Sequence, residues 1–367
     1  MSALSEFVLP TAEQELWRYS RIDELDLGSF TPGSFTTTVS ADGSIVSRAS
    51  RLALGDVSVE TPDVFEQMHV QQTSSGPIRD NHVRIGTARG QVVAEPVLVT
   101  HHIDESGLMC FPSLEIDAAE NSELTVVERF TSSGDPHSLL VPMVRIHAAQ
   151  SARISYVSIN ELGRRCWLLG YQRAIGERDS NIATSTIALG GDYSRLRAGV
   201  RLAGQGASAR QVALYFADGT QMHDFRTLQD HAAPRTRSDL LFKGAVKDQA
   251  KSVYTGLIKI RENADKSEAF QTNRNLTLSS GAWAESVPNL EIETNDVKCS
   301  HASTVGPVDD EQRFYLESRG IRPEVAERLV VFGFFADVIN RLPSAAQPDA
   351  LRNKVGKKLL GDNGVQV

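Results

Sequence analysis

Short β-rich segments follow one another from His82 to Val305 with hardly a helix signal between them. They alternate β-branched or aromatic residues with polar ones, which predicts strands, and turn residues such as those at 190–192 and 217–219 separate them. Among the clearest are SELTVVERF, ARISYVSINEL, NIATSTIALGG, SRLRAGVRLAG and ARQVALYFADG. Such a chain can stack its strands as a solenoid or pack them as a β-sandwich. Because no repeat consensus is visible, the residues alone favour neither fold.

The region before these segments is less regular. Apolar residues recur at helical spacing from 11 to about 27, between Thr11 as a candidate N-cap and Gly28 as a stop, which predicts a short helical lead-in. From Phe30 to about Pro77, Ser, Thr and Gly predominate. We expect β structure or an ordered arm there, without a compact domain of its own.

The region after the β-rich segments carries clear helix signals. Asp309 followed by Gln312 resembles a capping box, and Gly320 marks the end of that helix. Pro323 begins a second helix and Pro343 closes it. A third short helix is expected from position 348 to 360.

The second of these helices is apolar nearly all round. Some of its apolar residues follow the i, i+3, i+4, i+7 spacing of one buried face. Further apolar residues, including Phe334, lie outside that face. A helix of this kind is buried on more than one side. Its phenylalanines, Phe332, Phe334 and Phe335, therefore become candidates for contact with another protein.

Composition excludes several classes of partner. The formal net charge of −8 and the pI near 5.7 argue against a surface for nucleic acid or an anionic membrane, because both favour clustered Lys and Arg. No apolar run approaches the roughly 18–20 residues of a membrane helix. The N-terminal sequence MSALSEFVLPTAEQE lacks the basic-then-apolar order of a signal peptide. We therefore expect a cytoplasmic protein without nucleic-acid or membrane partners.

The three cysteines are far apart and never form a CxxC pair, so neither a disulfide framework nor a self-contained zinc site is indicated. Cys110 and Cys166 are flanked by large apolar residues and are expected in the core, with raised pKa values. In the pair His101-His102 the side chains point to opposite faces of a strand; we expect His101 at the surface and His102 in the core.

Cys299 and His301 are the candidate metal ligands. They alternate with other residues in a strand-like run, so their side chains share one face, roughly 7 Å apart at their backbones. Thiolate and imidazole both suit iron. The alternative is that both are ordinary interior residues of a β fold, and the residues by themselves favour that interpretation.

No catalytic motif of the GxSxG, HExxH or Walker A type is present, so any nucleotide hydrolysis coupled to this protein is expected on another chain. A β-helix enzyme acting on polysaccharide is the rival class. It would need convergent carboxylates on successive coils and normally a secretion signal, whereas the acidic residues of this chain are scattered.

Three segments carry a resemblance to a known family. They are HAAPRTRSDLLFKGAVKDQAKSVYTGLIKI from His231, NRNLTLSSGAWAESVPNLEI from Asn273, and VKCSHASTVGPVDDEQRFYLESRGI from Val297. This sequence resembles the core family shared by SufB and SufD, scaffold subunits of the Suf iron-sulfur cluster assembly machinery, and its third segment is closer to the SufD form. The resemblance is specific from about His231 to Pro343 and only architectural between about 85 and 230.

For the fold, the resemblance implies a right-handed parallel β-helix. The chain is then mainly β with α-helical termini, in three parts. These are an N-terminal helical lead-in and arm (1–80), the β-helix core (81–307) and a C-terminal helical domain (308–367).

For function, the resemblance implies a scaffold without enzymatic activity. The β-helix would pair with SufB, and the C-terminal helices with Phe332, Phe334 and Phe335 would dock the SufC ATPase. His301, and less strongly Cys299, would hold iron or a nascent iron-sulfur cluster transiently at the SufB interface, with no permanently bound cofactor. A homodimer, or a SufB-like scaffold, is the alternative assembly.

Overall fold

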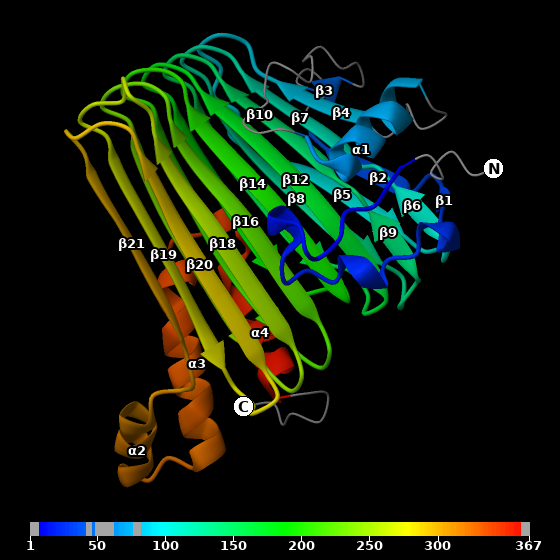
Figure 1. Ribbon diagram of the computed structural model, residues 1–367, viewed down its shortest axis with the longest axis vertical. Coiled ribbons are helices and arrows are strands. Elements are labelled where there is room, and N and C mark those ends of the chain that lie inside the picture. Colours follow the sequence, from blue (N-terminus) through cyan, green and yellow to red (C-terminus); the bar gives the residue numbers. More distant parts are fainter. Residues whose placement is uncertain (1–6, 42–45, 48–61, 76–81, 361–367) are drawn as a thin grey trace.

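The computed structural model describes residues 7–41, 46–47, 62–75 and 82–360. Most of them form a parallel β-solenoid of about eight turns (Figure 1), in which each turn gives one strand to each of two sheets. All strand pairs from β4 to β21 are parallel, so the parallel β-helix prediction is confirmed and the sandwich alternative is wrong. The right-handed winding that the resemblance implies follows the general rule for parallel crossovers.

The first sheet runs from β3 to β20. Its main path comprises β3 (Val46–Ser47), β4 (His82–Gly86), β7 (Ser113–Ala118), β10 (Met143–Ala148), β12 (Cys166–Gly176), β14 (Tyr193–Leu202), β16 (Met222–His231), β18 (Lys251–Ile260) and β20 (Trp283–Ile292). Three short strands, β1 (Thr31–Pro32), β6 (Leu108–Cys110) and β9 (Ser138–Leu140), pair beside this path.

The second sheet runs from β2 to β21. It comprises β2 (Thr36–Ser40), β5 (Val97–Ile103), β8 (Glu123–Ser132), β11 (Arg153–Glu161), β13 (Asn181–Ala188), β15 (Ser208–Ala217), β17 (Arg237–Val246), β19 (Glu268–Thr277) and β21 (Lys298–Gly306). Alternate residues of every strand face the lumen between the sheets.

One turn geometry recurs along the solenoid although its sequence does not. At this turn a residue with positive φ donates its N–H to a carbonyl of the next coil. The position is occupied successively by Gly90, Asn121, Ser151, Asp179, Gly206, Arg235 and Lys266. Because several residue types are held in this conformation by the coils on either side, the repeat is visible in the backbone and not as a consensus.

The N-terminal segment lies across the outer face of the first sheet (Figure 1). The predicted lead-in is helical, but it consists of three separate 3₁₀ turns, η1 (Glu15–Trp17), η2 (Ile22–Glu24) and η3 (Leu27–Ser29). Tyr19 has φ of 66°, which interrupts a helix. The described part of the segment from Phe30 contains short strands as expected, but also α1 (Val64–Ser75).

The helix α1 was not predicted, although its start is marked in the sequence. The Asp63 carboxylate accepts from the Glu66 N–H, and Glu66 accepts from the Asp63 N–H, which is a capping box directly after Pro62. Glu66 is buried and forms a bidentate ion pair with Arg173 of β12 at 2.7 and 2.8 Å. This pair fixes α1 to the sheet.

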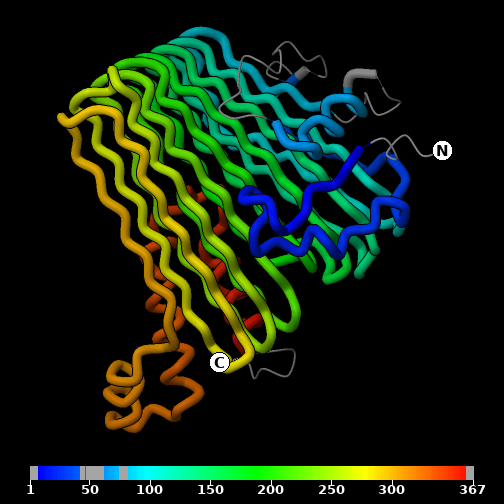
Figure 2. Tube along the Cα trace, viewed as in Figure 1, coloured from blue at the N-terminus to red at the C-terminus, as the bar shows by residue number. Residues whose placement is uncertain are grey.

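The C-terminal helices are α2 (Asp310–Ser318), α3 (Pro323–Ile339) and α4 (Pro348–Leu360), with a 3₁₀ turn η6 (Ser344–Ala346) between the last two. α3 and α4 cover the outer face of the second sheet, and α2 projects from the body beyond β21 (Figures 1 and 2). The predicted caps are confirmed: Asp309 accepts from two backbone N–H groups, Gly320 has φ of 85°, and Pro323 begins α3.

Candidate functional site at the open end of the solenoid

The last rung of the solenoid consists of β20 and β21, and each is the terminal strand of its sheet among the described residues. The backbone N–H of Lys298 donates to Ser267 beside β19. Since N–H groups alternate in direction along a strand, those of Cys299, His301, Ser303 and Val305 point away from β19. This free edge can accept a further strand.

Cys299 and His301 lie on the same face of β21, as their spacing predicts. Their register partners on β19 are Ala269 and Gln271, both buried in the lumen, so the shared face is the one that turns inward. Cys299 is half-buried against the cluster that contains Ile258 and Ile260, whereas His301 is exposed. Burial raises the pKa of the Cys299 thiol, which keeps it protonated in the isolated chain at neutral pH.

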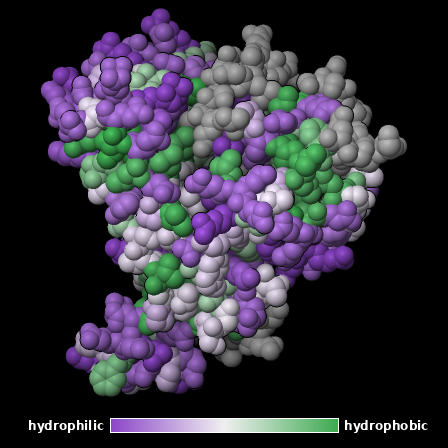
Figure 3. Space-filling view, in the orientation of Figure 1, coloured by the Kyte–Doolittle hydropathy of each residue, from purple (hydrophilic) through white to green (hydrophobic). Residues whose placement is uncertain are grey.

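The inward-facing side chains of the last rung are open to solvent. Leu290, Ile292 and Val305 are 40%, 42% and 44% exposed, although they lie on lumen-facing positions. One rung earlier, Ile258 and Ile260 pair in register with the two β20 residues and are fully buried. Hydrophobic surface is visible over this rim (Figure 3). The solenoid therefore ends on a surface built like a core and left uncovered by the described chain.

This rung supplies a thiol and an imidazole. A four-coordinate iron needs two further ligands, and among the residues that the structure describes no group of three or more His, Cys, Asp or Glu is arranged to hold a metal ion. A metal that binds Cys299 must displace the thiol proton, so binding would release protons.

The three predicted docking phenylalanines are covered to different degrees. Phe335 is fully buried, with its ring centroid 6.5 Å from that of Phe216 in β15. Phe332 and Phe334 are half-buried, and Lys243 of β17 lies 4.7 Å above the Phe334 ring. The apolar residues of α3 thus pack on one side against the second sheet and on another against α4.

The exposed aromatic residues of the helical part lie on α2 instead. Phe314 and Tyr315 are 70% and 58% exposed, and α2 buries none of its residues. The sequence offered a signal for them, because both are aromatic residues in a helix whose other residues, apart from Leu316, are charged or polar.

The other cysteines and the histidine pair are structural. Cys110 and Cys166 are fully buried, and burial raises their pKa values to about 12 and about 11, as expected for core thiols. His101 and His102 point to opposite faces, but their predicted places are reversed. His101 is buried, bonded to Glu128 at 3.0 Å, and His102 is half-exposed.

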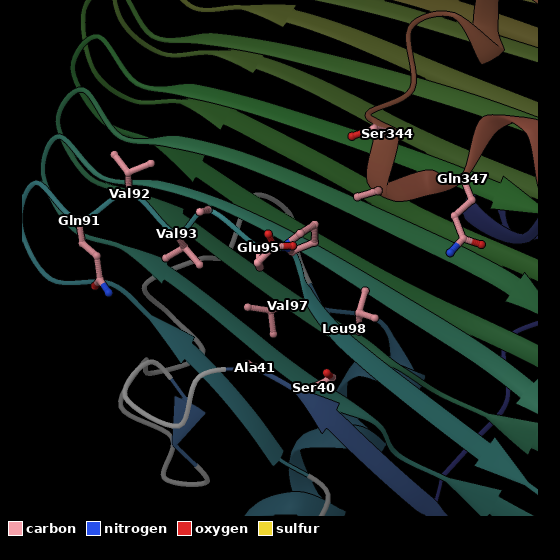
Figure 4. A pocket seen from close by; sticks show the side chains of 13 residues that line it. Ser40, Ala41, Gln91, Val92, Val93, Glu95, Val97, Leu98, Ser344 and Gln347 are labelled. Carbon is pink, nitrogen blue, oxygen red and sulfur yellow. The ribbon is translucent and has the colours of Figure 1, made fainter.

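A groove of about 780 Å³ lies at the opposite end of the molecule, between the chain before β5 and η6 (Figure 4). Val92, Val93, Val97 and Leu98 line it, and Glu95 is the ionisable side chain of its lining. It holds no constellation of chemically active groups and is remote from β21 along the chain of strands.

The chain is thus a parallel β-solenoid whose last rung carries Cys299 and His301 on one face. The family model "SUF system FeS cluster assembly, SufBD core domain" matches residues 101–334. This chain belongs to the SufBD family of iron-sulfur cluster assembly proteins. No helix among the described residues has the length and apolar character needed to cross a membrane.

Relatives match over most of the chain. An iron-sulfur cluster assembly SufBD family protein of Mycobacterium tuberculosis is 34% identical over 351 residues, which cover 92% of this chain and 86% of that protein. SufD of Escherichia coli is 27% identical over 96% of this chain and 90% of its own length. SufD of Bacillus subtilis is 29% identical over 73% and 62%.

Proposed function

We propose that this chain is a cytoplasmic, non-enzymatic scaffold subunit that pairs end to end with a second solenoid of the SufB type, and that a nascent iron-sulfur cluster is assembled between them. The observation that carries the proposal is the open rung of β20 and β21, where His301 is exposed on a lumen-facing position. The cluster is cargo, held by His301 and Cys299 on this side. The partner supplies the remaining ligands.

Pairing at this edge accounts for the features of the last rung together. A strand added beside β21 satisfies the free N–H groups, and a coil stacked on the rung covers Leu290 and Ile292. The same coil encloses Cys299 and His301 between two chains. Enclosure lowers the local dielectric and excludes water from the bound metal.

The C-terminal helices provide a second contact, which we assign to an ATPase of the SufC type. α3 is held to the solenoid by Lys243, whose ammonium lies 2.7 Å from Asp337 and 2.8 Å from the Phe334 carbonyl. α2 extends from this anchored helix with Phe314 and Tyr315 exposed. Of the three phenylalanines predicted for docking, the half-buried Phe332 and Phe334 can border such a contact, while Phe335 supports it from below.

The test of the cargo site is His301→Ala in a complex co-expressed with SufB-type and SufC-type chains. We expect normal co-purification and a loss of iron and acid-labile sulfide from the complex, because the exposed imidazole does not hold the fold together. His102→Ala, at a partly exposed histidine of β5, is the matched control and should keep its iron content. Unchanged cluster content in His301→Ala would remove this residue from the site.

The test of ATPase docking is a pair of charged substitutions, Phe314→Glu and Tyr315→Glu. They should release the ATPase while the SufB-type chain still co-purifies, because α2 contributes no residue to the core. Val92→Glu places the same charge on an exposed apolar residue at the far end and should retain both partners. Retention of the ATPase by the α2 variants would move the contact elsewhere.

A further inference from the structure

Directly behind His301, the amide of Gln271 is buried without a hydrogen-bond partner. Gln271 on β19 is the register partner of His301 on β21, and both face the lumen. Only 2% of Gln271 is exposed. Neither Nε2 nor Oε1 has a hydrogen-bond partner among the residues that the structure describes. An unpaired buried amide destabilises a fold, so stability does not explain this residue.

The lumen has room for the Gln271 amide because the facing residue is a glycine. A Cβ at Gly256, on the opposite sheet, would lie 2.6 Å from both Gln271 amide atoms and 2.4 Å from the Tyr254 hydroxyl oxygen. The Gln271 side chain therefore crosses the lumen, and a glycine leaves it room. Ser286 of β20, the register partner of Tyr254, also has a buried hydroxyl without a partner within the described chain. Unpaired polar atoms thus occur both on the last rung and on the rung before it.

Neighbouring lumen amides show that pairing is achievable in this part of the solenoid. Asn273 donates to the Tyr215 hydroxyl at 3.0 Å, and Asn275 donates to Asn273 at 2.8 Å. On the preceding rung, the register partner of Gln271 is Leu240 of β17, which is fully buried. A row of such register partners along the sheet forms a ladder. A leucine therefore fits this ladder, and a glutamine at 271 is not required by shape.

We propose that Gln271 is a positioning residue of the cargo site, whose amide N–H donates from the lumen side to a sulfide of the cluster held at His301 and Cys299. This inference rests on the proposed function. Hydrogen bonds to cluster sulfurs stabilise a cluster and set its reduction potential. The amide is left unpaired in the isolated chain because its acceptor arrives with the cargo.

This role predicts opposite effects on stability and on cargo. In the isolated full-length chain, Gln271→Leu should raise the thermal midpoint by about 2 °C or more, since it removes an unpaired amide from a position that accepts leucine. In the complex reconstituted with ferrous iron and sulfide, the same variant should hold its cluster about tenfold more weakly, with an altered visible absorption and circular dichroism spectrum. With ferrous iron alone it should bind as the parent does.

Gln211→Leu is the matched control. Gln211 lies on the same ladder two rungs behind Gln271, and its Oε1 is also buried without a partner in the described chain. This variant should leave cluster loading and spectrum unchanged. A lower midpoint for Gln271→Leu, or a parental cluster affinity and spectrum, would overturn the inference. His301→Ala separates the two proposals: cluster loss there with an unaffected Gln271→Leu refutes only the role of Gln271, and no loss in either refutes the cargo site itself.

Discussion

The two ends of the solenoid differ in whether the described chain covers their terminal strands. At the first end, β2 runs antiparallel to β5, and Thr37 of β2 bonds the buried His101 at 3.0 Å. His101 in turn contacts Glu128, and the Tyr156 hydroxyl donates to the same carboxylate at 2.5 Å. The chain thus covers β5 with its own strand, and His101, Glu128 and Tyr156 behind it are hydrogen-bonded. Nothing among the described residues does the same for β20 and β21.

Exposure at the last rung is a property of position and not of residue type. His101 and His301 are both lumen-facing histidines, and one is buried while the other is open. The same holds for isoleucines one rung apart, Ile260 and Ile292. An end that repeats the core pattern without a cover in the described chain is the observation on which the proposed docking of another chain rests.

The largest expected effect comes from truncating those two isoleucines. Ile260→Ala removes a fully buried side chain and should lower the free energy of unfolding by about 2–5 kcal/mol. Ile292→Ala removes a side chain that is already 42% exposed and should cost about 1 kcal/mol or less in the isolated chain. Urea unfolding measures both. Equal losses would show that the last rung is covered as fully as the rung before it.

The next effect concerns the free edge itself. Ser303→Pro removes an N–H that points away from β19, so the isolated chain should keep its thermal midpoint. Docking of a partner strand loses that hydrogen bond and meets the proline ring, which should weaken pairing with the SufB-type chain about 100-fold. Ser303→Ala is the control and should bind normally in the same titration calorimetry. Parental affinity for Ser303→Pro would place the interface away from β21.

A smaller effect follows from the histidines sealed inside the closed part. Burial lowers the pKa of His231 to about 4, with Thr236 and Ser238 as its hydrogen-bond partners at 2.7 Å. The unfolded chain binds this proton first as the pH falls, so stability should decrease from about pH 6.5 to about pH 4, by about 1.4 kcal/mol per pH unit for each such histidine.

His231→Gln tests this pH dependence. The glutamine keeps a hydrogen-bonding group but has no proton to gain, so the decline in unfolding free energy between pH 6.5 and pH 4.5 should be shallower by about one proton than in the parent. Denaturant unfolding at several pH values measures the slope. An identical slope would mean that water reaches His231 from the open end.

Much of this architecture follows from residues that obey local rules. Alternation placed Cys299 and His301 on one face, and the signals at Asp309, Gly320 and Pro323 fixed the ends of the C-terminal helices, because caps and strand faces depend on neighbours in sequence. Alternation also separated His101 from His102. The prediction placed His102 in the core, where the structure has His101. Alternation separates the two faces of a strand, but the surrounding coils decide which face turns inward.

What escaped prediction depends on contacts distant in sequence. α1 is short and gains its hold on the sheet from the Glu66–Arg173 pair, 107 positions apart. The exposure of His301 agrees with the interface position that the family resemblance implies, but no local pattern around position 301 records that the described chain has no coil beyond β21. The unpaired amide of Gln271 is likewise visible only when the two sheets face each other.

The most direct measurement is hydrogen exchange at β21 in the isolated chain and in the complex with a SufB-type partner. The amides of Cys299, His301, Ser303 and Val305 should exchange quickly in the isolated chain, in alternation with slower neighbours bonded to β19. On complex formation these four should become protected together. Protection already present in the isolated chain, or fast exchange that persists in the complex, would contradict a scaffold that is completed at this edge by another chain.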